Sequence, residues 1–135
     1  MLIARLVSLL SNLPEAIAQA EQEVVSATRA LHEAKEQLST KESELVLEGK
    51  ITGKNDTERR AQLLALTLTE RQAVAAAEDA LAKARLEYNK KVNEFKAARS
   101  IASLFAQLSA DVSDRSQPSA TALDHLEPRT GHTVS

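Results

Sequence analysis

The residues best placed for chemistry lie in the segment Gly49–Asn55, which reads Gly-Lys-Ile-Thr-Gly-Lys-Asn. Two glycines, a lysine and a following helix N-terminus are groups that bind phosphate in nucleotide-binding loops. A Walker A loop has four residues between its glycines and a Ser or Thr after the lysine. Here three residues separate the glycines, Asn55 follows Lys54, and the preceding segment has a helical pattern. We therefore expect a turn that connects two helices, not a nucleotide site.

Four basic side chains nevertheless make this turn locally basic. They could contact an acidic protein surface or a phosphate backbone, although a solvated helix connection is the simpler interpretation. These candidate contact residues are Lys50, Lys54, Arg59 and Arg60.

The remaining chemistry-bearing residues do not form a recognisable site. His32, His125 and His132 are too scattered for a metal site, and the absence of cysteine removes thiolate ligands and cysteine nucleophiles. Catalysis requires a concave, water-poor site with convergent polar groups, which two long helices do not supply. We expect a protein that is not an enzyme and that has no metal or cofactor.

The elements that position these residues are predicted by an apolar heptad seam, in which one residue in seven is apolar and a second row follows three residues later. The second row is interrupted by Lys41. The seam consists of Ile3, Leu10, Ile17, Val24, Leu31, Leu38 and Leu45, with Leu6, Leu13, Ala20, Ala27 and Ala34.

A second seam lies further along the chain, with Lys91 as its polar member. In an antiparallel pair of helices, a register in which facing residue numbers sum to 108 sets large against small side chains, such as Ala27 against Leu81 and Ala20 against Tyr88. The second seam consists of Val74, Leu81, Tyr88, Phe95 and Ala102, with Ala77, Ala84, Ala98 and Phe105.

Composition supports one elongated helical domain. The 135 residues include 3 Gly, 3 Pro and 2% aromatic residues, and the net charge is -2, which gives no overall attraction to nucleic acid or anionic membrane. No run approaches the roughly 20 apolar residues of a membrane span, and Arg5 and Glu15 argue against a signal peptide. We expect a cytoplasmic protein without membrane contact.

The positions of the helix-breaking glycine and proline residues predict a helical hairpin over residues 1–110. We expect a helix over 2–48, kinked near Pro14, a turn over 49–55 and a helix over 56–110. Asn55 and Glu58 form a capping-box pattern at the second helix start. A further start at Thr69 is an alternative, but threonine is tolerated inside helices and we favour a continuous helix.

Residues 111–135 have no apolar periodicity and contain Pro118, Pro128 and Gly131. Such a composition does not offset the entropy of ordering its backbone, so we expect a flexible tail. The predicted fold is therefore an all-α, antiparallel two-helix coiled-coil hairpin with a flexible C-terminal tail.

Charge and exposed leucines indicate how the hairpin is used. Residues 15–48 carry eight acidic and three basic residues, whereas residues 70–99 carry five acidic and seven basic residues, so the arms attract each other. A lone pair of helices leaves residues such as Leu64, Leu104 and Leu108 partly uncovered, and we expect self-association or a protein partner.

The turn at 48–55 and the following Thr57–Leu63 segment, Thr-Glu-Arg-Arg-Ala-Gln-Leu, resemble the turn of small helical proteins of unassigned function from phage and prophage genomes. The resemblance covers roughly twenty residues, implies a phage accessory role and transfers no site residues. We expect a coiled-coil module for protein interaction or assembly. The alternative is a nucleic-acid accessory factor in replication or recombination that uses the basic turn.

Overall fold

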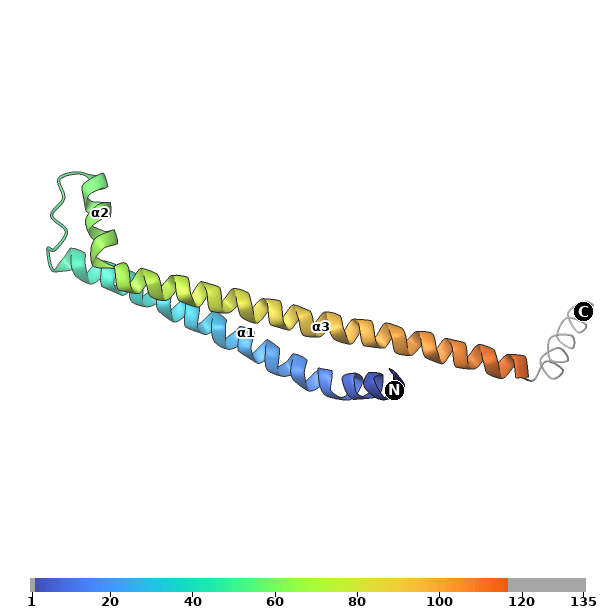
Figure 1. The fold of residues 1–135 in the computed structure, drawn as a ribbon. Coiled ribbons are helices and arrows are strands. Elements are labelled where there is room, and N and C mark those ends of the chain that lie inside the picture. The colour runs from blue at the N-terminus through green and yellow to red at the C-terminus, as the bar shows by residue number, and fades with distance from the viewer. Residues whose placement is uncertain (1, 117–135) are drawn as a thin grey trace, which may run out of the picture. The chain divides into compact units, whose positions relative to one another are not determined.

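The computed structural model describes the backbone of residues 2–116 and the side chains of residues 2–113. Every regular element in this part of the chain is a helix (Figure 1), as predicted. The helices are α1 (Leu2–Leu47), α2 (Asp56–Leu66) and α3 (Leu68–Ser116).

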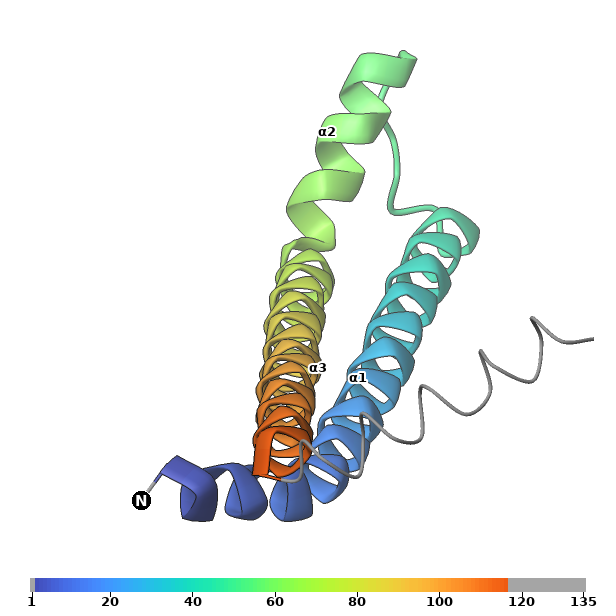
Figure 2. The ribbon, with the colours of Figure 1, turned by 90° about the vertical axis from the view of Figure 1, so that its right-hand side faces the viewer.

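The described residues form two compact units. Unit 2 comprises Asn12–Glu94, and unit 1 comprises residues 2–11 together with residues 95–116. Within unit 2, α1 and α3 lie side by side and run in opposite chain directions, as Figures 1 and 2 both show. The loop after α1 and the short helix α2 make the chain reversal.

The predicted seam residues form the interior of unit 2. Leu13, Ala20 and Leu45 of α1 and Leu81 of α3 are buried. The other predicted positions of both rows within this unit are half-buried, including the lysines at 41 and 91. The 3.5-residue spacing keeps one stripe of each helix turned toward its neighbour, so these positions are confirmed.

In unit 1 the seam is covered only over part of its predicted length. Leu6 and Ala98 are buried, and Leu10, Phe95 and Ala102 are half-buried. Ile3 is 65% exposed and Phe105 is 37% exposed, so the prediction of covered seam positions is wrong for these two residues. Both residues lie where the paired segments end, and a heptad pattern alone does not show where a partner helix stops.

The first helix agrees with its prediction to within one residue. Pro14 lies inside α1, which continues through it without a restart. Proline lacks an N–H donor and its ring crowds the preceding turn, and the kink near Pro14 stays a prediction.

The prediction of one continuous helix over residues 56–110 is wrong, because the chain breaks at Thr67. This residue is the C-cap of α2, with φ -114° and ψ 22°, values outside the α-helical range. Its hydroxyl donates to the carbonyl oxygen of Leu63, an acceptor that its own N–H also uses at 3.0 Å. Side-chain competition of this kind weakens a helix locally and bends it.

The C-terminal end of α3 also differs from the prediction. The helix continues to Ser116 instead of ending at residue 110, so the predicted boundary of the tail at residue 111 is wrong. Residues 111–116 contain neither Gly nor Pro, so no helix breaker interrupts α3 over this stretch. The rest of the predicted tail, residues 117–135, lies outside the described residues.

Candidate interaction surfaces

The turn after α1 is built on Gly49, which has a φ of +71°. The N–H of Lys50 donates to the carbonyl oxygen of Leu45 at 3.0 Å, and the N–H of Gly49 donates to that of Val46 at 3.1 Å. These two bonds form a Schellman motif, which satisfies carbonyls that the helix end leaves without partners. The predicted helix stop at Gly49 is confirmed.

The second glycine, Gly53, has a different role, because its missing side chain lets the loop lie close against α2. A Cβ added at Gly53 would lie 2.7 Å from the backbone nitrogen of Arg59, closer than non-bonded atoms approach. Gln62 closes this contact, because its side-chain oxygen accepts from the N–H of Thr52 at 2.9 Å and of Gly53 at 2.8 Å. Its amide nitrogen donates to the hydroxyl of Thr52 at 3.1 Å.

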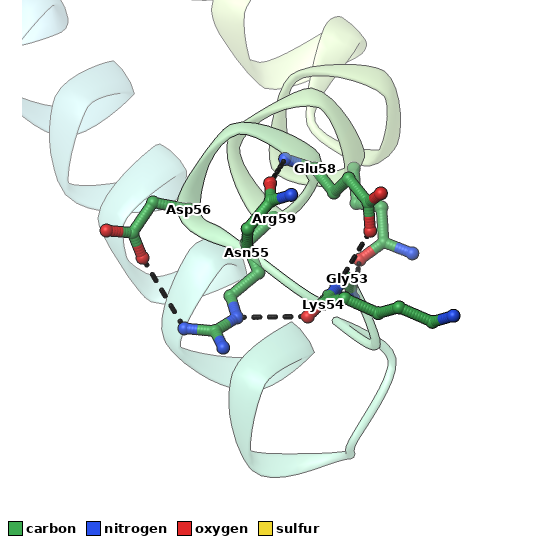
Figure 3. A network of polar contacts seen from close by, with 7 residues as sticks. Gly53, Lys54, Asn55, Asp56, Glu58 and Arg59 are labelled. Carbon is green, nitrogen blue, oxygen red and sulfur yellow. Dashed lines mark hydrogen bonds and ion pairs between the residues drawn. The ribbon is translucent and has the colours of Figure 1, made fainter.

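The N-terminus of α2 carries the predicted cap in a modified form (Figure 3). The side chain of Asn55 accepts from the N–H of Glu58 at 2.9 Å. The carboxylate of Glu58 accepts from the N–H of Lys54 at 2.8 Å, one residue earlier than in a standard capping box. The cap thereby satisfies the N–H of Glu58 in the first turn of α2 and the N–H of Lys54 just before the helix.

These hydrogen bonds engage several of the backbone donors that a phosphate-binding loop would need. A phosphate-binding loop offers several unoccupied backbone N–H groups to one anion. In this turn the N–H groups of residues 52, 53 and 54 already donate to Gln62 and Glu58, and the N–H groups of residues 49 and 50 donate to α1 carbonyls. These five backbone donors are therefore engaged within the chain.

The four basic residues of the turn divide into two groups. Lys50 pairs with Glu48 at 3.0 Å. Arg59 donates through Nε to the carbonyl oxygen of Gly53 at 3.1 Å and lies 3.5 Å from the carboxylate of Asp56. The side chain of Lys54 extends away from this network in Figure 3. Arg60 borders a hollow next to Leu63, Leu64 and Arg71.

All four basic residues are exposed, and acidic side chains lie among them. Between residues 48 and 60 the chain carries four basic and three acidic residues, so the turn has only a small excess of positive charge. Two of the cations, Lys50 and Arg59, are engaged in contacts within the turn. Among the side chains that the structure describes, Lys54 and Arg60 are in no ion pair, whereas Lys50 and Arg59 are paired but remain more than half exposed.

A polar junction that the sequence analysis missed lies at the break between α2 and α3. Thr67 is 0% exposed and is the only polar residue among the described side chains that is buried. Its hydroxyl oxygen accepts from Nε of Arg71 at 3.0 Å, and the guanidinium of Arg71 pairs with Glu42 of α1 at 3.0 Å. This chain of contacts ties the helix break to α1. The sequence pattern that could have indicated this junction is Thr67 four residues before Arg71. In the register that sums to 108, Thr67 lies opposite Lys41 and next to Glu42.

The side of the junction facing solvent is hollow and mostly apolar. One hollow of about 530 Å³ is lined by Glu42, Ser43, Val46, Leu47 and Leu63. A second, of about 280 Å³, is lined by Glu42, Arg60, Leu63, Leu64 and Arg71. Both are open surface depressions, and their apolar walls come from the end of α1 and from α2.

An acidic hollow of about 440 Å³ lies along α1 and the start of α3, and its lining includes Glu33, Glu36, Glu44 and Glu70. Within residues 2–116 no group of three His, Cys, Asp or Glu side chains is placed to hold a metal ion. His32 lies 3.0 Å from Glu36 in an exposed pair on one helix face. His125 and His132 are outside the described residues.

The largest concentration of exposed apolar side chains is in unit 1. Of the sixteen large apolar residues exposed in the described chain, nine belong to this unit, although it contributes only residues 2–11 and 95–116. Four lie on α1 and five on α3. They are Leu2, Ile3, Val7, Leu9, Ile101, Leu104, Phe105, Leu108 and Val112.

Comparisons with known proteins identify no relative of this chain. No protein-family model, no curated protein and no solved structure matches this chain. None of the helices in the described part of the chain combines the length and apolar character needed to cross a bilayer.

Proposed function

We propose that the chain is a non-catalytic module for protein interaction or assembly, built as an antiparallel two-helix coiled-coil hairpin in the register that sums to 108. The observation that carries the proposal is the seam of unit 2, where most half-buried or buried positions of α1 and α3 fall on the two heptad rows. The interior of such a pair is filled by its own side chains. Function then falls to the outer surfaces.

The character of those surfaces supports binding to protein. The hollows of the described residues are shallow and open, while apolar side chains are exposed at the α1–α2 turn and in unit 1. Exposed apolar patches on a small protein mark contact sites for other proteins. The same proposal includes a phage accessory role, which the resemblance of the turn to phage and prophage proteins supports, and a cytoplasmic location.

The register can be tested by distance measurement, because the chain has no cysteine and accepts spin labels at chosen sites. Val25 and Lys83 are both exposed, and their numbers sum to 108. Labels on Val25→Cys and Lys83→Cys should give a short distance by pulsed electron resonance. Labels on Val25→Cys and Lys90→Cys should lie about 10 Å further apart along the axis. A shorter distance for the second pair would reject the register.

The interaction role is tested by recovering partners with the tagged full chain from native cells. A seam-disrupting variant, Ala20→Glu, is the matched control, since Ala20 is buried. A protein partner should bind the wild type and be lost with the variant. An intact hairpin that recovers no protein at cellular concentration would reject the role.

Nucleic-acid binding through the turn is the second candidate, and it depends on Lys54 and Arg60, the two cations without a contact within the turn described above. It predicts binding to DNA or RNA that weakens steeply with salt and falls further in the Lys54→Glu, Arg60→Glu variant. Fluorescence anisotropy at about 50 mM salt measures this. The absence of binding under these conditions removes the candidate.

A further inference from the structure

The C-terminal part of α3 carries an apolar stripe that the described chain leaves exposed, most fully toward its C-terminal end. Ile101, Phe105, Leu108 and Val112 follow one another at spacings of four, three and four residues, with Leu104 beside them, and all five are exposed. Every described side chain from Ser103 to Ser113 is exposed. Figure 1 shows the red end of α3 running past the first turn of α1, in the same unit.

This spacing is that of a helix that packs against another helix. Phe105 and Val112 continue the second row of the seam, and Ile101 and Leu108 lie one residue, or about 100° around the helix, before its first-row positions 102 and 109. The stripe therefore extends the seam face of α3 into a stretch where its side chains are exposed. Its length from residue 101 to residue 112 is about 17 Å. A partner helix of similar length would cover it.

The distribution of charge along the stripe favours a second copy of this chain as that partner, in antiparallel orientation. Residues 100–110 contain no charged side chain, so two identical stripes can meet without like-charge repulsion. Arg99 precedes the stripe and Asp111 lies near its C-terminal end. An antiparallel pair brings Arg99 of each copy within about one helical turn of Asp111 of the other, whereas a parallel pair sets like against like.

We propose that two copies of the chain associate through this stripe about a two-fold axis that passes between residues 106 and 107. In this arrangement facing residue numbers sum to 213, so Ile101 meets Val112 of the second copy and Phe105 meets Leu108. These are the first-to-second position layers expected of antiparallel helices. Residues 117–135 are a poorer cover, because their only large apolar side chains are Leu123, Leu126 and Val134.

The inference deepens the proposed interaction role by naming its partner, and its test separates the two. Sedimentation of the full chain should show a concentration-dependent dimer. Leu108→Lys and Phe105→Glu, each alone, should raise the dimer dissociation constant at least about a hundredfold, since each change removes two apolar layers per dimer. An equal mixture of the two variants should recover the dimer, because the introduced lysine of one copy then faces the introduced glutamate of the other.

The matched control is Leu86→Lys, which changes the same residue type on α3 at a position that is 71% exposed in unit 2. It should leave the dimer unchanged. Circular dichroism checks that each variant keeps its helical content, and Val112→Lys replaces Leu108→Lys if the latter loses helix. The Leu123→Ser, Leu126→Ser variant should associate as the wild type does.

Four results would overturn the proposal. In the first, the wild type stays monomeric at high micromolar concentration, and in the second the Leu108→Lys variant dimerises normally. In the third, the dimer is recovered only when Leu108→Lys is mixed with Leu108→Glu. In the fourth, the chain dimerises only when Leu123 and Leu126 are replaced. The third would indicate a parallel pair and the fourth coverage by the chain's own C-terminal residues. A monomer that retains the 108 register and binds another protein would refute the dimer alone and leave the proposed function standing.

Discussion

Replacing Thr67 by valine tests whether the junction between α2 and α3 is held by its hydrogen bonds. Valine has nearly the shape of threonine, so the fully buried site stays filled while the hydroxyl is removed. The carbonyl oxygen of Leu63 keeps the N–H of residue 67 as its donor at 3.0 Å. The group that loses its partner is Nε of Arg71, which donates to the hydroxyl at 3.0 Å.

The expected loss of stability depends on how well other partners replace the hydrogen bond that Arg71 loses. A buried hydrogen bond to a charged group contributes about 1.5 to 3 kcal/mol. The side chain of Arg71 is 38% exposed and retains Glu42 at 3.0 Å, so water replaces part of the loss. We expect Thr67→Val to lower the free energy of unfolding by about 1 kcal/mol. Thr67→Ala should lose about 1 kcal/mol more, because it also leaves a space the size of a methyl group.

The assay is urea unfolding followed by circular dichroism, at one fixed protein concentration so that association contributes equally to every variant. Thr28→Val is the matched control, since the hydroxyl of Thr28 donates to the carbonyl oxygen of Val24 at 2.8 Å on an exposed helix face. It should change stability by less than about 0.5 kcal/mol. Equal losses in both variants, or a more stable Thr67→Val protein, would refute the reasoning. In a double-mutant cycle, Thr67→Val and Arg71→Met should couple by about 0.5 to 1 kcal/mol.

Three further predictions concern the turn and the seam. Gly49→Ala should cost about 1 to 2 kcal/mol because φ is +71°, and an unchanged melting temperature would contradict this. Asn55→Ala should cost about 1 kcal/mol by removing the acceptor of the Glu58 N–H, whereas Asn55→Asp should retain stability in the same thermal melt; equal losses would exclude a capping role. Ala20→Leu should cost about 1 to 3 kcal/mol in urea unfolding because the site is buried, while Ala18→Leu at an exposed position should stay within about 0.5 kcal/mol, and the reverse order would disprove the seam.

Features that depend on neighbours along the chain were predictable from the sequence. The helix stop at Gly49 requires a left-handed residue, and the cap at Asn55 requires a side-chain acceptor three residues before Glu58. Both are satisfied within about one turn of chain. The seam was predictable for the same reason, because the heptad period fixes which side chains share a helix face before any partner is known.

The sequence identified four basic candidate contact residues in the turn, but it did not show which contacts each side chain makes. Lys50, Lys54, Arg59 and Arg60 are close in sequence, and sequence alone weights them equally. The tertiary structure distinguishes them, because Arg59 donates to the carbonyl of Gly53 only when the loop folds back on α2. That fold depends on the missing Cβ of Gly53 and on Gln62, nine residues away.

The break at Thr67 and the extent of the seam were decided by tertiary structure. A threonine inside a helical pattern is compatible with continuity, and it favours a break here because its buried hydroxyl donates to the carbonyl oxygen of Leu63 and accepts from Arg71, whose guanidinium pairs with Glu42 of α1. The amino-acid sequence by itself determined that the chain forms long helices with one apolar stripe each and a capped turn between them, since these follow from periodicity and local backbone preference. Only the tertiary structure decided which polar groups are buried and which apolar residues, such as Ile3 and Phe105, remain exposed, because burial depends on where the opposing helix begins and ends.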